Sequence, residues 1–167
     1  IKNTLVSYHE HNKRECGERI LASLKEGSSW ALVTDAGTPG ISDPGEDMVA
    51  LCAENSIPVT LVPGACALID ALVLSSISAR RFVFEGFLSA QPSERKAALR
   101  ALAAEGRSTI FHEAPHKRRA TLDDMCEIMG ADRRIALCRE LTKLNEEIIR
   151  TTLGGAVALY EEKEPRG

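Results

Sequence analysis

The stretch Val33-Thr-Asp-Ala-Gly-Thr-Pro-Gly-Ile-Ser-Asp-Pro-Gly45 decides how this chain is interpreted. It follows the short apolar run Trp30–Val33, which is typical of a buried strand, and it precedes a segment expected to be helical as far as Glu54. Ligands bind at the carboxyl ends of strands in parallel α/β sheets, and Gly37 and Gly40 let a ligand approach the backbone closely. Because the stretch lacks Gly-x-Gly-x-x-Gly and the P-loop pattern, it is neither the usual dinucleotide fingerprint nor a P-loop. A ligand-binding loop and an ordinary turn-rich connection both remain open.

Outward from this loop, expected strands and helices alternate along the chain. The strands are expected at residues 28–34, 57–62, 82–87, 108–112, 134–139 and 147–152. The helices are expected at residues 13–26, 44–54 with Asp43 as N-cap, 65–76, 93–104, 115–130 and 154–162. This alternation predicts an α/β fold with a largely parallel sheet. A change of character near residues 78–81 predicts two lobes, residues 1–79 and 80–167.

Composition excludes several classes of protein. The chain has 167 residues, of which 44% are hydrophobic and only 4% aromatic. No apolar run approaches the length of a membrane span, and the scarcity of aromatics argues against a stacking platform for single-stranded nucleic acid. Five scattered cysteines without a Cys-x-x-Cys pair indicate reduced thiols in a cytoplasmic protein rather than a zinc site or disulfides. Because the chain opens at Ile1, we interpret it as a piece of a longer protein.

Charge is unevenly distributed. Residues 80–119, here called the basic segment, carry nine Lys and Arg against four Asp and Glu, which leaves +5 on a chain of net charge −3. A phosphate-binding face and a solvated helix surface both remain open for this segment. Its cations are Arg80, Arg81, Arg95, Lys96, Arg100, Arg107, Lys117, Arg118 and Arg119.

A second strand-to-helix turn, Pro63-Gly-Ala-Cys-Ala67, follows the next expected strand. It should lie beside the first loop at the same sheet edge, and its small residues leave room for a flat ligand such as an adenine. Tight packing of the helix on the sheet is the alternative explanation.

Two stretches in the second half carry titratable side chains. Phe111-His-Glu-Ala-Pro-His116 places a carboxylate and two imidazoles beside Lys117, a combination able to move a proton and hold a phosphate. Alternatively, Glu113 caps the helix that Pro115 opens, and Pro115 argues against a metal site on one continuous helix. Arg139-Glu-Leu-Thr-Lys-Leu-Asn-Glu-Glu147 joins two expected strands and has the alternating charge of a solvent-facing loop.

These motifs occur in the same order in one group of proteins. The chain resembles the small-subunit ribosomal RNA methyltransferases of the tetrapyrrole (corrin/porphyrin) methylase superfamily over essentially its whole length. The resemblance rests on residues 7–12, 34–45, 63–64 with 67–68, 84–88, 111–116 and 139–143.

The resemblance implies two α/β lobes with S-adenosylmethionine in the cleft between them, homodimers, and methylation of a cytidine ribose 2′-hydroxyl in ribosomal RNA of the small subunit. For this reaction we expect Glu113 and His116 to accept or orient the proton, and Arg139 and Lys143 to steer a phosphate or stabilise the developing alkoxide. No metal is expected, because the sulfonium already activates the methyl group. The residues implied to contact the cofactor are Asp35, Gly37, Thr38, Pro39, Ile41, Cys66, Ala67, Phe111 and His112.

The chain departs from the family pattern in two respects. Cys66 stands where family members commonly have Ser, and a thiol is a weaker hydrogen-bonding group. The family also begins with a strand and further motifs before Ile1 and continues beyond Gly167 to a terminal apolar strand, so this piece is expected to lack sheet strands and part of the cleft. The alternatives to ribosomal RNA methylation are methylation of a tetrapyrrole carbon and a non-catalytic, dimer-forming α/β fragment.

Overall fold

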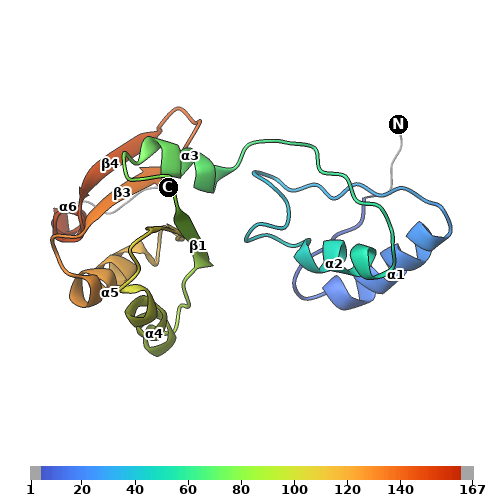
Figure 1. Ribbon diagram of the computed structural model, residues 1–167, viewed down its shortest axis with the longest axis horizontal. Coiled ribbons are helices and arrows are strands. Elements are labelled where there is room, and N and C mark those ends of the chain that lie inside the picture. Colours follow the sequence, from blue (N-terminus) through green and yellow to red (C-terminus); the bar gives the residue numbers. More distant parts are fainter. Residues whose placement is uncertain (1–4, 163–167) are drawn as a thin grey trace. The chain divides into compact units, whose positions relative to one another are not determined.

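The computed structural model describes residues 5–162 and divides the chain into two compact units, Ile1–Cys66 and Ala67–Gly167 (Figure 1). The division lies before the expected lobe boundary at residues 78–81. The reason is α3 (Ala67–Leu74), an apolar helix that contacts β2 (Ser108–His112) and β3 (Arg134–Arg139) of the second unit. Helices and strands together make the protein an α/β protein.

The first unit consists of two packed helices, α1 (Lys13–Lys25) and α2 (Glu46–Glu54), joined by long irregular segments. Cys16 and Ile20 lie one helical turn apart on α1 and are buried together with Cys52 of α2. Helix α2 begins after Gly45, and the predicted cap at Asp43 is wrong, because no side chain caps this helix.

Neither strand predicted in the first unit forms. Within residues 5–66 the structure contains no strand, although residues 30–33 and 59–62 carry the apolar side chains that predicted one. Val33 is 74% exposed and Val62 is 84% exposed. An isolated strand leaves its N–H and C=O groups without ladder partners, and nothing in residues 5–66 supplies a neighbour. The prediction of these two strands is therefore wrong for this structure.

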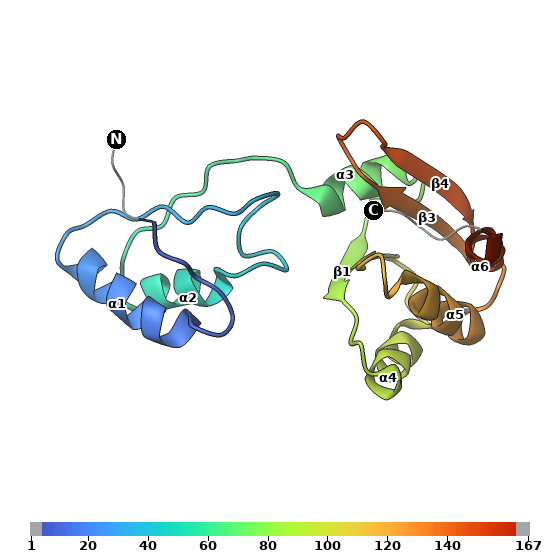
Figure 2. The same ribbon diagram turned by 180° about the vertical axis from the view of Figure 1, so that it is seen from behind.

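The second unit contains two two-stranded sheets with helices packed between and beside them (Figure 2). Strands β1 and β2 are parallel and joined through α4, as predicted. Strands β3 and β4 are antiparallel, so the expectation of a largely parallel sheet is wrong here, since the short loop 140–146 cannot make a crossover. The remaining elements are β1 (Phe82–Phe87), α4 (Pro92–Leu102), α5 (Arg118–Met129), β4 (Glu147–Thr152) and α6 (Leu153–Glu162).

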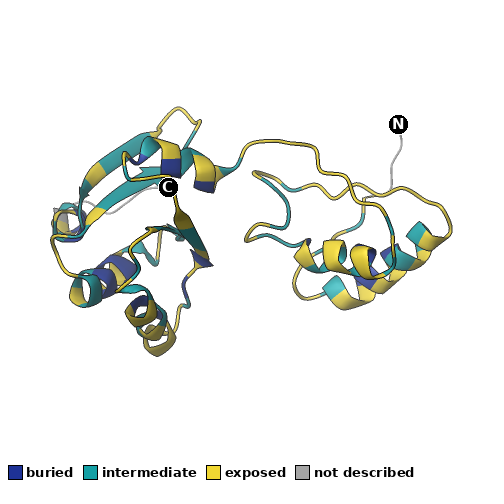
Figure 3. Ribbon diagram, in the orientation of Figure 1, coloured by how far each residue is buried: buried dark blue, intermediate teal, exposed yellow. Residues whose placement is uncertain are grey.

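The core of the second unit lies where α5 packs against α4 and α6 (Figure 3). Leu99 of α4 and Leu153 of α6 are almost completely excluded from solvent. A buried ion pair also joins two of these helices, because Arg95 Nε and Nη2 both lie 2.7 Å from Asp124 Oδ2. No helix within residues 5–162 is both long and apolar enough to cross a membrane.

Candidate functional site

The glycine-rich loop of the first unit folds back on itself. Gly37, Gly40 and Gly45 have φ angles of +74°, +81° and +138°, which L-residues rarely adopt. A Cβ on buried Gly45 would lie 2.5 Å from Leu32 Cδ2 and 3.4 Å from the Gly40 nitrogen, so only glycine fits there. Around Gly37, in contrast, a Cβ would meet nothing within 4 Å. The loop is therefore anchored at Gly45 and accessible at Gly37.

The two glycine-containing segments meet within the first unit. The Thr38 hydroxyl donates a 3.1 Å hydrogen bond to the Ala65 carbonyl, which joins the loop to the segment Pro63–Cys66. The two segments therefore lie side by side as predicted, although the sheet expected beneath them is absent from residues 5–66. Asp35 and Ile41 are exposed, Pro39 and Cys66 are partly exposed, and Ala67 opens α3 in the second unit.

Phe111 and His112 lie at the carboxyl end of β2. Phe111 packs against the core, whereas the His112 ring contacts Phe84 and Phe87 edge-on, with ring centroids 5.0 and 5.4 Å away. Burial lowers the pKa of His112 below its ordinary value of 6.5, so its imidazole is mainly neutral at pH 7.

The Glu113 carboxylate organises the entry to α5. One oxygen, Oε1, accepts a 2.8 Å hydrogen bond from the Ala114 N–H and lies 3.1 Å from Lys117 Nζ. The other, Oε2, accepts a 2.6 Å hydrogen bond from the Thr121 hydroxyl. This geometry favours an orienting role for Glu113. His116, in contrast, is exposed and forms no side-chain hydrogen bond with any described residue.

Arg139 and Lys143 lie at the hairpin that joins β3 to β4. Arg139 pairs with Glu147 directly across the two strands, and that hydrogen bond raises the pKa of the guanidinium. Lys143 Nζ lies 3.1 Å from Glu140 Oε1 in the turn, with most of the side chain exposed. Both cations therefore have acidic partners within the hairpin.

The basic segment is not a continuous positive face. Four of its cations pair with carboxylates of this unit: Arg95 with Asp124, Lys96 with Asp124 and Glu127, Arg107 with Glu105, and Lys117 with Glu113. The pairing with Arg107 lowers the pKa of Glu105 to about 2. Among the cations outside these pairs, the exposed ones are Arg80, Arg81, Arg100 and Arg119.

Sequence reasoning missed an irregularity in β1. The register of β1 against β2 shifts between Phe84 and Gly86, and Gly86 has a φ of +66°. A β-bulge of this kind often lies next to a functional site. The glycine inside an otherwise alternating strand was the signal that indicated it.

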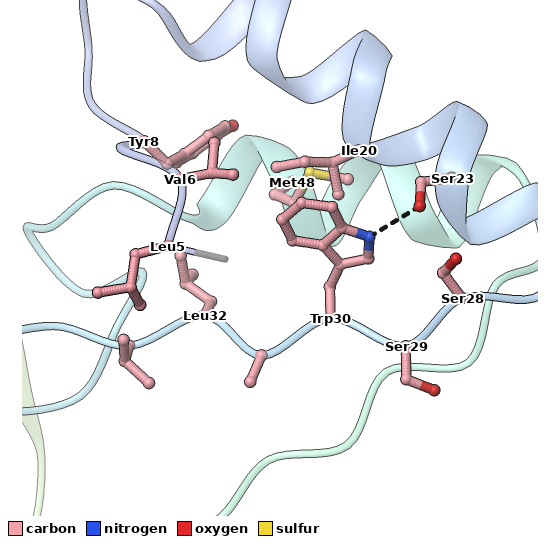
Figure 4. A pocket seen from close by; sticks show the side chains of 12 residues that line it. Leu5, Val6, Tyr8, Ile20, Ser23, Ser28, Ser29, Trp30, Leu32 and Met48 are labelled. Carbon is pink, nitrogen blue, oxygen red and sulfur yellow. Dashed lines mark hydrogen bonds between the residues drawn. The ribbon is translucent and has the colours of Figure 1, made fainter. Parts of the chain in front are cut away.

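A hollow of about 550 Å³, lined by both apolar and polar side chains, lies beside Trp30 in the first unit (Figure 4). Ile20, Met48 and Val6 face the indole ring, and the indole N–H donates a 3.2 Å hydrogen bond to the Ser23 hydroxyl. None of the residues predicted to bind a ligand lines this hollow. It is therefore separate from the candidate site.

Comparison with known proteins identifies relatives along the whole chain. Ribosomal RNA small subunit methyltransferase I of Synechocystis sp. is 48% identical over 167 residues, and the protein of that name from Bacillus subtilis is 46% identical. These alignments cover all of this chain but only 60% and 57% of those relatives. The protein of the same name from Thermotoga maritima is 41% identical, and 74% of its length is covered.

A solved structure and a family model agree on the fold. The structure of uroporphyrin-III C-methyl transferase from Thermus thermophilus, complexed with S-adenyl homocysteine, aligns with a TM-score of 0.60 and 18% identity. The alignment covers 96% of this chain and 72% of that one. The model of the tetrapyrrole (corrin/porphyrin) methylases matches residues 2–157, and the chain belongs to that family.

Proposed function

We propose that the protein transfers a methyl group from S-adenosylmethionine to a cytidine ribose 2′-hydroxyl in ribosomal RNA of the small subunit. The observation that carries this proposal is the gradient of identity. Relatives named for small-subunit ribosomal RNA are 41–48% identical across the whole chain, whereas the solved structure named for uroporphyrin-III is 18% identical. We further propose that the protein acts as a cytoplasmic homodimer.

The first unit offers residues that fit the cofactor. Gly37 and Gly64 have open space where a Cβ would stand, so a ligand can reach their backbone. The bond from Thr38 to Ala65 brings both segments to one place, and exposed Ile41 offers an apolar contact. These features support cofactor binding by Asp35, Gly37, Thr38, Pro39, Ile41 and Cys66. We propose the same role for Ala67, Phe111 and His112, which belong to the second unit. Bound S-adenosylmethionine supplies an electrophilic methyl group.

The second unit offers groups for handling the hydroxyl proton. A ribose hydroxyl is a weak nucleophile, so transfer needs an in-line approach and a proton acceptor. His116 is exposed and free of intramolecular hydrogen bonds among the described residues, which favours it as that acceptor. Glu113, whose carboxylate is engaged by Ala114, Lys117 and Thr121, holds the segment in place. Arg139 and Lys143 steer the RNA backbone by charge.

Methyl transfer from radiolabelled S-adenosylmethionine to small ribosomal subunits tests the proposal. We expect label in the ribosomal RNA of unmethylated subunits, at a single cytidine whose 3′-phosphodiester resists alkali because its 2′-hydroxyl is blocked. Labelling of a tetrapyrrole and not of RNA would favour the alternative suggested by the solved structure. Binding of S-adenosylmethionine without transfer to either substrate would favour a non-catalytic fragment.

A second experiment tests whether the exposed cations of the basic segment bind RNA. Charge reversal at Arg81 or Arg119 should weaken RNA binding and reduce the salt dependence of log K by about 0.7–0.9 for each phosphate that the protein no longer neutralises. Lys25→Glu, on the exposed surface of α1, is the matched control and should change neither quantity. Lys117 is unsuitable, because its substitution also removes the interactions with Glu113 and the Leu88 carbonyl.

A further inference from the structure

The phenylalanines of this chain are concentrated in one place. The sequence contains four, and all lie on the parallel pair: Phe82, Phe84 and Phe87 on β1, and Phe111 on β2. The low aromatic content of the whole chain argued against a stacking surface. Because the few aromatic rings gather on two adjacent strands, that argument does not apply to this edge of the second unit.

The bulge in β1 determines which way these rings point. Phe84 pairs with Ile110, Gly86 with Phe111 and Phe87 with His112, so Glu85 is the extra residue. In a regular strand, side chains three positions apart point to opposite faces. Here the inserted residue turns Phe87 to the side of Phe84, and both rings contact the imidazole of His112.

In this arrangement the side chain of Phe87 is exposed to solvent. It is 53% exposed although it is a large apolar side chain at the end of a strand. Lys117 Nζ lies 5.8 Å from the centre of its ring and donates a 3.3 Å hydrogen bond to the Leu88 carbonyl, while also pairing with Glu113. The bulge interrupts the regular backbone hydrogen bonding between β1 and β2, and the Phe87 ring is exposed beside it.

We propose that Phe87, with the His112 imidazole packed edge-on against it, forms a stacking platform for one nucleobase of the RNA substrate, with Lys117 beside it to contact a base oxygen or a phosphate. The inference rests on the proposed function and names a subsite for its substrate. A nucleobase fits because it is flat and polar at its edge, and because it is attached to phosphates that a neighbouring ammonium attracts. Stacking on Phe87 holds the base without reading its sequence.

Substitutions at the two ends of β1 test the platform in the complete protein. Phe87→Ala and Phe87→Leu both remove the aromatic face, and the leucine variant keeps an apolar side chain next to His112. Phe82→Ala is the matched control, because Phe82 lies at the other end of the same strand and is 38% exposed. Phe87→Trp restores an aromatic face. Thermal melting of each variant verifies folding.

We expect about tenfold weaker binding of a small-subunit ribosomal RNA fragment for both Phe87→Ala and Phe87→Leu. Phe82→Ala should bind as the parent protein does, and Phe87→Trp should recover most of the affinity. Affinity for S-adenosylmethionine, measured by calorimetry, should change by less than about twofold in every variant.

Unchanged RNA affinity in Phe87→Leu would overturn the platform, as would a loss confined to S-adenosylmethionine, which would place the cofactor adenine on Phe87 instead. Tighter binding of a tetrapyrrole than of RNA to the parent protein would overturn the platform together with the proposed function. A parent protein that methylates RNA, combined with unaffected Phe87 variants, overturns the platform alone.

Discussion

The two units of this chain use similar apolar sequences with different results. In the second unit, the runs 108–112 and 134–139 become paired strands beside a core in which Leu99 and Leu153 are sealed from water. In the first unit, residues 30–33 and 59–62 are just as apolar but stay unpaired and largely exposed. The difference teaches that an apolar run becomes a strand only when the chain also supplies a hydrogen-bonding neighbour.

The comparison predicts a large difference in hydrogen exchange. Amides of residues 30–33 and 59–62 have no ladder partner, so they should exchange at least about a hundredfold faster than ladder amides of β2 and β3. Exchange followed by mass spectrometry of peptides measures this directly. Equal protection in the two sets of peptides would show that the strands of the first unit are paired.

Shortening a core side chain of the second unit should destabilise that unit much more than the first. Leu99→Ala should lower the free energy of unfolding of the second unit by about 2–5 kcal/mol, because it leaves a cavity among α4, α5 and α6. Circular dichroism in urea measures this loss. Trp30, the single tryptophan, reports the first unit by fluorescence, and its transition should move much less. Leu144→Ala is the control, since Leu144 is 98% exposed and should cost under about 0.5 kcal/mol.

The buried ion pair offers a further contrast within the second unit. Asp124→Asn leaves the Arg95 guanidinium buried without a counter-charge and should cost about 3 kcal/mol. Glu127→Gln removes an exposed partner of Lys96 and should cost under about 1 kcal/mol. Urea denaturation of both variants compares them. If the two variants lost the same free energy of unfolding, the buried ion pair of Arg95 with Asp124 would contribute no more to stability than the exposed pair of Lys96 with Glu127.

The smallest expected effect concerns His112. Its folded-state pKa lies below its ordinary value of 6.5, so the unfolded chain binds more protons near pH 6. Stability of the second unit should therefore be fully present above about pH 6.5 and fall as pH drops towards the folded-state pKa. Urea denaturation at pH 5.5 and 7.5 should show this loss, and His112→Gln should reduce it. An unchanged pH dependence in the variant would assign the effect to other groups.

Sequence reasoning worked best where structure is local. The bounds of β1 to β4 agree with the expected ranges, and each helix was expected within a few residues, because periodicity, glycines and prolines act over short distances. The strands of the first unit depend on hydrogen-bonding partners that periodicity does not identify. Periodicity does not give strand direction either, although the short loop 140–146 requires β3 and β4 to be antiparallel. The cap at Gly45 was missed because Leu32 and Gly40 approach that residue only in the folded chain.

Prediction of the candidate site was uneven in the same way. The meeting of residues 35–45 with 63–66 followed from two successive strand-to-helix turns, and the bond from Thr38 to Ala65 agrees with it. The alternative role of Glu113, as the cap of a helix that Pro115 opens, is wrong, because α5 begins at Arg118 and no side chain within residues 5–162 caps it. The bulge at Gly86 was missed although the glycine inside β1 was a signal for it, because the extra residue is defined only once the two strands are aligned. The pairing of Arg95 with Asp124 likewise joins residues far apart in sequence.

The different connections within the two small sheets also predict the order in which the sheets form during folding. Strands β3 and β4 are joined through the short loop 140–146, and hairpins of this kind close in about 1–10 μs. The pairing of Phe82 with Ser108 must await closure of a longer segment that contains α4, which costs more chain entropy and slows the step. The hairpin is therefore expected to exist before β1 meets β2. Since Phe87 faces His112 only after that meeting, the platform is one of the last features of the unit to assemble.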